Sequence, residues 1–365
     1  MNREAVDRFI NSKFIVALIC KDGYCPALNL NENNLDLMLM LMHYKLSKNE
    51  IKKYLNLSEE EFIYRINFLE EDGLIFKAWD GSYVPSCMAI SLEEAEELYE
   101  KSKDFVDETI ELFIDNMEEI KEKTLNMRCY KDFKFEDLSL FILSDVLMNS
   151  FQIENIEKYF IKRHPPIRNE KRYYLALLEQ RMGDEREAFG LYGNMGVSFE
   201  DFDICMYGSR DSTENILTLN DEQLKEYFGF EDINNIYDIK EELLRDLLKL
   251  YSDKDYSIKE SIKSGFNRLN LMIGDKLNVP VMSREEYDNL FDIASITLKP
   301  YIEIFQNNKE VLMEYYRESS YYGEISFEEY FIYWYHFYYS LTTDRLIEKG
   351  LIKNEKNQLF TYIIM

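Results

Sequence analysis

The segment from Leu46 to Lys77, LSKNEIKKYLNLSEEEFIYRINFLEEDGLIFK, constrains the fold more than any other part of the chain. Ser47 and Ser58 are each followed by a glutamate three residues later, which is the signature of a capping box at a helix start. After Ser58, the apolar residues Phe62, Ile63, Ile66 and Leu69 recur at helical spacing and predict the buried side of a helix, and Gly73 is placed to end that helix. Because residues 35–44 are almost wholly apolar, they predict a short buried helix in front. The segment therefore predicts three consecutive helices.

Beyond Gly73 the pattern changes from helical to extended. Residues 74–90 hold two β-prone runs on either side of Asp80-Gly81, a pair that favours a hairpin turn. Residues 13–30 likewise predict two strands around a turn at residues 21–23. We therefore expect residues 1–90 to form a domain of helices with β-hairpins.

The order helix, helix, short turn, helix, hairpin resembles the winged helix-turn-helix domains of bacterial transcription regulators. YRINFLEEDGLI (residues 64–75) is particularly similar to the Lrp-type families, and the resemblance covers about residues 30–90. It implies a DNA-binding regulator whose third helix enters the major groove. By this resemblance, residues of the second helix, the third helix and the wing would contact DNA phosphates and base edges. These residues are Lys48, Lys52, Lys53, Tyr64, Arg65, Asn67 and Lys77.

The same region is also similar to the PqqD-type domains that recognise precursor peptides in peptide-modifying systems. The similarity rests on N-terminal strands followed by LNLNENNLDLMLMLM (residues 28–42) and a compact helical unit. It implies that a peptide adds as a strand along residues 13–20 and packs against the third helix. The sequence thus leaves two partners open, DNA and a peptide or protein.

Charge separates these two partners only in part. The chain of 365 residues has a net charge of −26, so the molecule as a whole repels phosphate backbones. Residues 1–90 contain 10 basic and 13 acidic side chains, a net of −3, and the remaining residues therefore carry −23. Only the N-terminal domain can approach nucleic acid without a large electrostatic cost. Its acidic third helix, however, suits a basic or apolar peptide better.

The rest of the chain is expected to be helical. Residues 91–123 predict one long helix that packs on its own domain or forms a homodimer, within a connecting region of residues 91–163. The prolines of KRHPPIRNE (residues 162–170) mark a boundary before an acidic helical effector or oligomerisation domain, residues 164–365. Residues 172–195 resemble one tetratricopeptide-type helical hairpin. RLIEKGLIKN (345–354) echoes residues 68–77 and suggests a second wing-like unit before a closing strand.

The aromatic run FEEYFIYWYHFYY (residues 327–339) is the most unusual stretch of the C-terminal region. Aromatic side chains cover nearly every side of the predicted helix, which is typical of a helix buried in a core. The alternative is a pocket for an apolar or cationic effector, lined by Tyr330, Trp334, Tyr335 and Tyr338.

Signatures of catalysis are mostly absent, and we expect a protein that is not an enzyme and binds no cofactor or metal. His43 and His336 lie in apolar helices and are expected to be hydrogen-bonded core histidines. The five cysteines are scattered, which favours free thiols in a reducing compartment, although Cys20 and Cys25 could pair across a turn. With no apolar N-terminal segment or spanning helix, the expected location is cytoplasmic.

Overall fold

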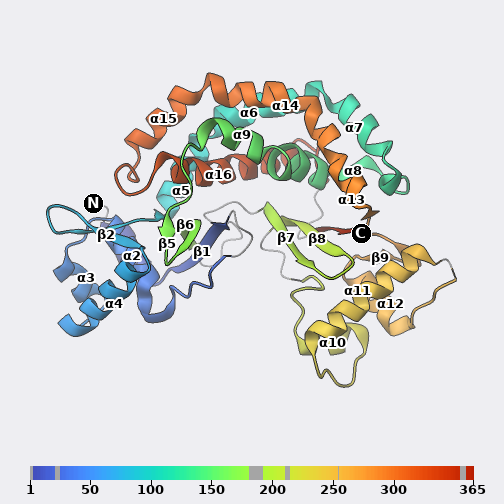
Figure 1. Cartoon of the computed structure of the whole chain (residues 1–365), viewed down its shortest axis with the longest axis horizontal. Helices are drawn as coiled ribbons and strands as arrows, with labels where there is room; N and C mark the ends of the chain where they lie inside the picture. Colours follow the sequence, from blue (N-terminus) through green and yellow to red (C-terminus); the bar gives the residue numbers. More distant parts are fainter. Residues whose placement is uncertain (1–2, 21–24, 181–191, 210–213, 254, 354–358) are drawn as a thin grey trace. The chain divides into compact units, whose positions relative to one another are not determined.

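The computed structural model describes residues 3–20, 25–180, 192–209, 214–253, 255–353 and 359–365 (Figure 1). Helices make up most of the regular structure, in agreement with the expected mainly helical fold. Among the described residues, no helix combines the length and apolar character needed to cross a membrane. The chain forms two compact units, and each unit is assembled from three separate stretches. Unit 1 contains Met1–Leu112, Ile153–Gly190 and Lys299–Thr342, and unit 2 contains Phe113–Gln152, Leu191–Leu298 and Thr343–Met365.

Unit 1 begins with a small module of three helices and a hairpin, as the sequence indicates. We call residues 35–85 the N-terminal module. The capping boxes of Ser47 and Ser58 are both formed, so two of its helices begin where the sequence predicts. The elements of this part are α1 (Arg3–Phe9), β1 (Lys13–Cys20), the 3₁₀ turn η1 (Glu32–Asn34), α2 (Leu35–His43), α3 (Lys48–Tyr54), α4 (Glu59–Glu71), β2 (Ile75–Lys77) and β3 (Tyr83–Pro85).

The sheet of unit 1 has the order β1-β6-β4, with β6 (Lys171–Gln180) at its centre. β1 runs antiparallel to β6, whereas β4 (Met88–Ile90) runs parallel to it, and β5 (Ile167–Arg168) pairs with the start of β6. The hairpin β2–β3 forms a separate ladder. β1 therefore pairs with β6 and not with this hairpin. The second strand expected within residues 13–30 is absent from residues 25–30, and residues 21–24 lie outside the described part.

Two helical predictions for segments that begin in this unit are wrong. Residues 172–180 belong to β6 and residues 192–198 to β7, so no tetratricopeptide-like hairpin forms in the described part of residues 172–195. Tyr173 to Leu178 are buried on both faces of the sheet, and such a run has no alternation to distinguish it from a helix. The predicted helix over residues 91–123 is divided at Ser102 and Asn116 into α5 (Leu92–Glu100), α6 (Lys103–Asp115) and α7 (Met117–Leu125).

Unit 1 is completed by helices from later in the chain: α9 (Ile153–Phe160), α15 (Lys309–Glu318) and most of α16 (Phe327–Glu348). The aromatic run lies in α16. Phe305, which belongs to unit 1, contacts the rings of Trp334, Tyr335 and Tyr338, and all four side chains of this aromatic cluster are buried.

Unit 2 also combines a mixed sheet with a module of helices and a hairpin. We call residues 221–277 the C-terminal module. The prediction of an all-helical C-terminal region is therefore wrong, because strands β7 to β12 lie within that region. The elements are η2 (Arg128–Tyr130), α8 (Phe135–Leu140), the π-helix η3 (Phe141–Ser150), β7 (Tyr192–Ser198), β8 (Asp203–Ser209), α10 (Asp221–Phe228), α11 (Ile236–Ser252), α12 (Glu260–Arg268), β9 (Met272–Ile273), β10 (Lys276–Leu277), β11 (Val281–Met282), α13 (Arg284–Asp288), the first half of α14 (Leu290–Asn307) and β12 (Leu359–Ile364). The second half of α14, from Lys299, belongs to unit 1.

The two units share one topology. In unit 1 a strand (β1), the N-terminal module and a short strand (β4) follow each other, and β4 lies parallel to the central strand β6. In unit 2 the same order is β8, the C-terminal module and β11, with β11 parallel to the central strand β12. Each short strand leads into a capping-box serine, Ser91 or Ser283, that starts the next helix. Unit 2 adds β7 beside β8.

The two halves of the chain exchange helices. α15 and most of α16 come from the second half but belong to unit 1, whereas α7, α8 and η3 come from the first half but belong to unit 2. α7 and α15 each follow an asparagine N-cap, Asn116 or Asn308, and α8 and α16 begin with Phe-Glu-Asp and Phe-Glu-Glu. The chain is therefore a duplication with interleaved halves.

Two further expectations are wrong, one for the segment that follows α16 and one for the cysteines at and after the end of β1. The predicted second wing at residues 345–354 is not formed by its described residues: Gly350 follows α16 with a φ of 72°, and the closing strand β12 joins the sheet of unit 2. Cys20 and Cys25 are joined by a disulfide, with their Cα atoms 5.5 Å apart, so the expectation of free thiols fails for this pair. Cys87, Cys129 and Cys205 are free.

Candidate docking surface on the N-terminal module

The N-terminal module is built on α2, whose residues from Leu35 to His43 are all buried. α4 packs against this core with Phe62, Ile66 and Leu69, which the sequence predicts as its apolar positions. These three residues follow a spacing of three and four and fill one side of the helix. The other sides of α4 lie outside this buried stripe and can contact a partner.

The outward side of α4 is apolar and acidic. Ile63, Tyr64 and Phe68 are exposed, and 68% of Tyr64 is accessible to solvent. Ile63 was expected among the buried residues, but it lies beside Phe62 in sequence and so points to a different side of the helix. Glu59 and Glu60 are exposed in the first turn, where a carboxylate is favoured by the helix dipole.

The hairpin β2–β3 extends this apolar character. Phe76 is exposed on β2, and Trp79 in the turn is 99% exposed. Gly81 has a φ of 87°, which allows the tight turn that carries Trp79 outward. We call Ile63, Tyr64, Phe68, Phe76 and Trp79 the docking face. Of these five, only Tyr64 is among the contact residues expected from the sequence. The other four are apolar residues outside the buried stripe, and that position is the sequence signal for their exposure.

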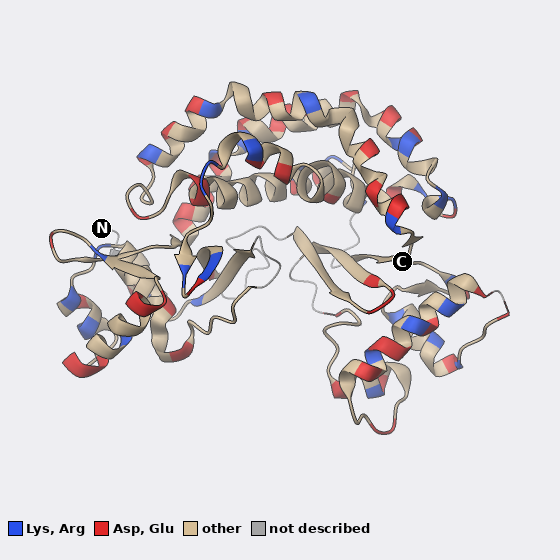
Figure 2. Cartoon of the chain, viewed as in Figure 1, with Lys and Arg blue, Asp and Glu red and all other residues tan. Residues whose placement is uncertain are grey.

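The lysines expected to hold phosphate are largely engaged with the protein itself. Lys48 forms an ion pair with Glu59, and Lys52 donates to the same carboxylate at 2.8 Å. Hydrogen bonds from Lys48 and then Lys52 lower the pKa of Glu59. The ammonium of Lys48 also lies 5.5 Å from the centre of the Phe62 ring. The ribbon in Figure 2 shows these basic positions on α3 next to the acidic start of α4.

The other residues expected to contact nucleic acid differ in their exposure and in their contacts. Lys53 and Asn67 are exposed, whereas Arg65 is half-buried. Lys77 on the hairpin lies 5.8 Å from the centre of the Tyr83 ring. The structure therefore places these residues on one module, where Lys48 and Lys52 are paired with a carboxylate.

The four residues of the alternative ligand pocket are core residues. Tyr330, Trp334, Tyr335 and Tyr338 are each at most 1% exposed. Tyr335 shares a hydrogen bond with Tyr301 at 2.8 Å, and Tyr338 shares one with Thr109 at 2.6 Å. The aromatic run is thus packed in the interior of unit 1.

His43 lies at the end of α2 between two carboxylates. Its Nδ1 is 2.6 Å from Glu324 and its Nε2 is 2.7 Å from Glu94, while Lys45 also meets Glu324. Burial of the ring opposes its charge, but the negative charge of Glu94 and these hydrogen bonds raise the pKa of His43 to about 9. His336 bonds to the carbonyl of Ile332 at 2.7 Å, so both are hydrogen-bonded core histidines as expected.

Comparison with known proteins identifies no relative. No protein-family model, no curated protein and no solved structure matches the chain. The function is therefore inferred from the residues of the module alone.

Proposed function

We propose that the N-terminal module is a winged helix-turn-helix used for protein recognition, and that the chain binds a basic polypeptide segment with apolar anchors. The docking face carries this proposal. Five large apolar side chains are exposed on the outward side of α4 and on the hairpin. In other winged domains the same elements contact the partner.

The composition of the docking face fits a protein partner. Tyr and Trp are enriched at protein interfaces and dominate their binding energy when they enter a pocket of the partner. Trp79 and Tyr64 are both largely accessible, and Phe68 follows Tyr64 by four residues on the same side of α4. These rings provide anchors that a DNA backbone does not use.

The charge of the same region selects a basic partner. Glu59 and Glu60 border the apolar residues. Lys48 and Lys52 are already paired with Glu59, so their positive charges are matched within the module. The chain carries a net charge of −26, which attracts a positive segment and repels phosphate. The expected role as a DNA-binding regulator is the rival hypothesis, because winged domains commonly read DNA.

Trp79 provides a direct assay. The chain has two tryptophans, and the other, Trp334, is fully buried. Titration with a short synthetic Lys/Arg-Leu amphipathic peptide is expected to shift the Trp79 emission to the blue, whereas the same peptide with glutamates for its basic residues leaves it unchanged. Tyr64→Ser with Phe68→Ser is expected to weaken binding tenfold or more. The matched control, Tyr237→Ser with Ile273→Ser, replaces exposed apolar residues of unit 2 and is expected to have no effect.

The rival hypothesis is tested on the same protein. Random-sequence duplex DNA is titrated at low and at physiological salt, with Lys52→Glu plus Lys53→Glu as the variant. Binding that falls steeply with salt and is lost in this variant would establish DNA recognition and overturn the proposal. Equal binding of the basic and acidic peptides would also overturn it.

A further inference from the structure

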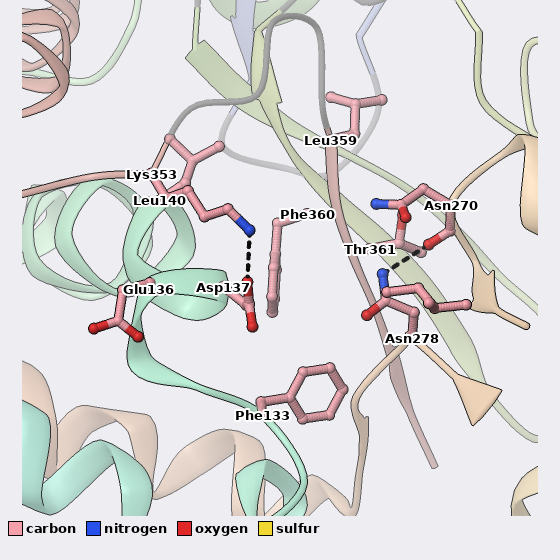
Figure 3. A pocket seen from close by; sticks show the side chains of 11 residues that line it. Phe133, Glu136, Asp137, Leu140, Asn270, Asn278, Lys353, Leu359, Phe360 and Thr361 are labelled. Atoms are coloured by element: carbon pink, nitrogen blue, oxygen red, sulfur yellow. Dashed lines mark hydrogen bonds and ion pairs between the residues drawn. The ribbon is translucent and has the colours of Figure 1, made fainter. Parts of the chain in front are cut away.

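A cavity of about 170 Å³ lies in unit 2 beside the C-terminal module (Figure 3). Its lining combines two carboxylates, two asparagines and two aromatic rings. Figure 3 shows Lys353 joined to Asp137 on one side and Asn270 joined to Asn278 on the other. The lining residues that matter here are Phe133, Glu136, Asp137, Asn270, Asn278 and Phe360.

Unit 1 has a side chain of its own at the corresponding place. Arg168, at the end of β5, is 1% exposed and its guanidinium is held by three acceptors. Nη1 donates to the carbonyl of Tyr173 at 2.5 Å, and Nη2 donates to Glu329 at 2.9 Å and to the carbonyl of Ser86. The backbone of Arg168 also lies against Gly73, at the end of α4.

The hairpins of the two modules match at their base, although the hairpin of unit 1 is longer. In both, a residue with positive φ follows the third helix, at 68° in unit 1 and 58° in unit 2. The next residue accepts a backbone hydrogen bond from the far side of the hairpin, at 2.8 Å in unit 1 and 2.9 Å in unit 2. The matched pairs are Gly73 with Asn270, Leu74 with Leu271, and Ser86 with Asn278.

The strands and helix starts give the remaining acceptors. Leu177 faces Ala89 in unit 1, as Ile363 faces Val281 in unit 2, which aligns β6 with β12. α16 and α8 begin with the same Phe-Glu-acid triplet. The matched acceptors are therefore Tyr173 with Leu359 and Glu329 with Asp137, and the second of each pair lines the cavity.

The described side chains fill the two places differently. Lys353 pairs with Asp137 at 2.9 Å, but both side chains are nearly half exposed, whereas Arg168 and Glu329 are buried. An ammonium is a single point of charge, whereas a guanidinium presents five N–H donors in a planar fork. Lys353 therefore meets the carboxylate at the rim without filling the cavity.

We propose that this cavity of unit 2 binds a guanidinium group, as an arginine side chain of a partner or as a small guanidinium compound. The volume of the cavity is below that of sites for drug-sized ligands, so it suits one functional group and not a large cofactor. Asp137 would accept the guanidinium in place of Lys353, and the Phe360 ring offers a face for cation–π contact. The inference stands independently of the docking face, which lies in unit 1.

Ethylguanidinium is the first probe, with ethylammonium as the control cation, and its binding to the full chain is measured by ligand-observed saturation-transfer NMR. We expect ethylguanidinium to bind and ethylammonium to bind at least tenfold more weakly. Asp137→Asn is expected to weaken ethylguanidinium binding tenfold or more, because hydrogen bonds to a charged group are lost. Glu242→Gln removes an exposed carboxylate of the same unit outside the cavity and is expected to leave binding unchanged.

Lys353→Met provides a second variant, which removes the competing cation and is expected to tighten ethylguanidinium binding. The proposal is overturned if ethylammonium binds as well as ethylguanidinium, or if folded Asp137→Asn binds it unchanged. An arginine-containing tripeptide, blocked at both ends, separates the two sources. Binding stronger than that of ethylguanidinium identifies a polypeptide arginine, and equal binding identifies a small guanidinium compound.

Discussion

Two buried cationic groups of unit 1, Arg168 and His43, each contact carboxylates. Arg168 and Glu329 are each 1% exposed and bonded at 2.9 Å. His43 is enclosed by Glu94 and Glu324. Removing one partner of such a pair leaves a buried charge uncompensated, at a cost of about 3–5 kcal/mol. These pairs therefore fix where α2, α5 and α16 meet β5 and the loop before α16.

His43 makes the stability of the protein dependent on pH. Its folded pKa of about 9 lies above the ordinary value of 6.5, so the protonated ring stabilises the fold. This contribution, about 3 kcal/mol at most, is complete below pH 6.5 and is lost as pH rises through 9. Urea denaturation is expected to show that the stability difference between wild type and His43→Gln shrinks over this range. The exposed His164→Gln is expected to match wild type throughout, and a difference independent of pH would contradict the assignment.

At the scale of elements, a glycine sets the distance between two helices of the C-terminal module. A Cβ at Gly265 on α12 would lie 2.4 Å from the Phe228 ring on α10. Gly265→Ala is therefore expected to destabilise the protein by about 1–3 kcal/mol, as overpacking does, despite the better helix propensity of alanine. Thermal denaturation checks this, with the exposed Ser264→Ala on the same helix as control. If added Phe228→Leu fails to restore stability, the clash is not the cause.

Local sequence signals predict some helices and strands better than others. α3 and α4 begin where the capping boxes of Ser47 and Ser58 indicate, because a cap involves only residues close in sequence. β6 was mistaken for a helix, because its strand is defined by pairing with β1 and β4 and by burial on both faces. The exposed face of α4 follows from the same periodicity that gives its buried face, so the exposure of Tyr64 and Phe68 could be predicted from the sequence.

At the scale of the whole molecule, the duplication is visible in sequence once the structure supplies its frame. TIELFIDN (residues 109–116) aligns with YIEIFQNN (301–308), and IEKYFIK (156–162) aligns with IEKGLIK (347–353). The similarity between residues 68–77 and 345–354 pairs different elements, α4 with α16. Short similar stretches separated by about half the chain length do not reveal which units they build.

The interleaving of the halves predicts how fragments behave. Residues 1–190 lack Glu329 and the α16 core of unit 1, and residues 191–365 lack α8 and η3 of unit 2. We expect neither fragment to fold as a monomer and the two to form a soluble one-to-one complex when co-expressed. Size-exclusion chromatography with circular dichroism checks this. A folded monomeric fragment would contradict the exchange of helices.

The sequence by itself determined the helix starts, the buried stripe of α4, the hairpin after Gly73 and the acidic character of the chain, because these depend on local spacing and composition. Only the tertiary structure decided that β6 and β12 are central strands and that the halves exchange helices. It also decided that Arg168 fills in unit 1 a place that, in the described part of unit 2, is a cavity beside Asp137. The physical reason is that burial and strand pairing join residues far apart in sequence, and local patterns carry no record of that choice.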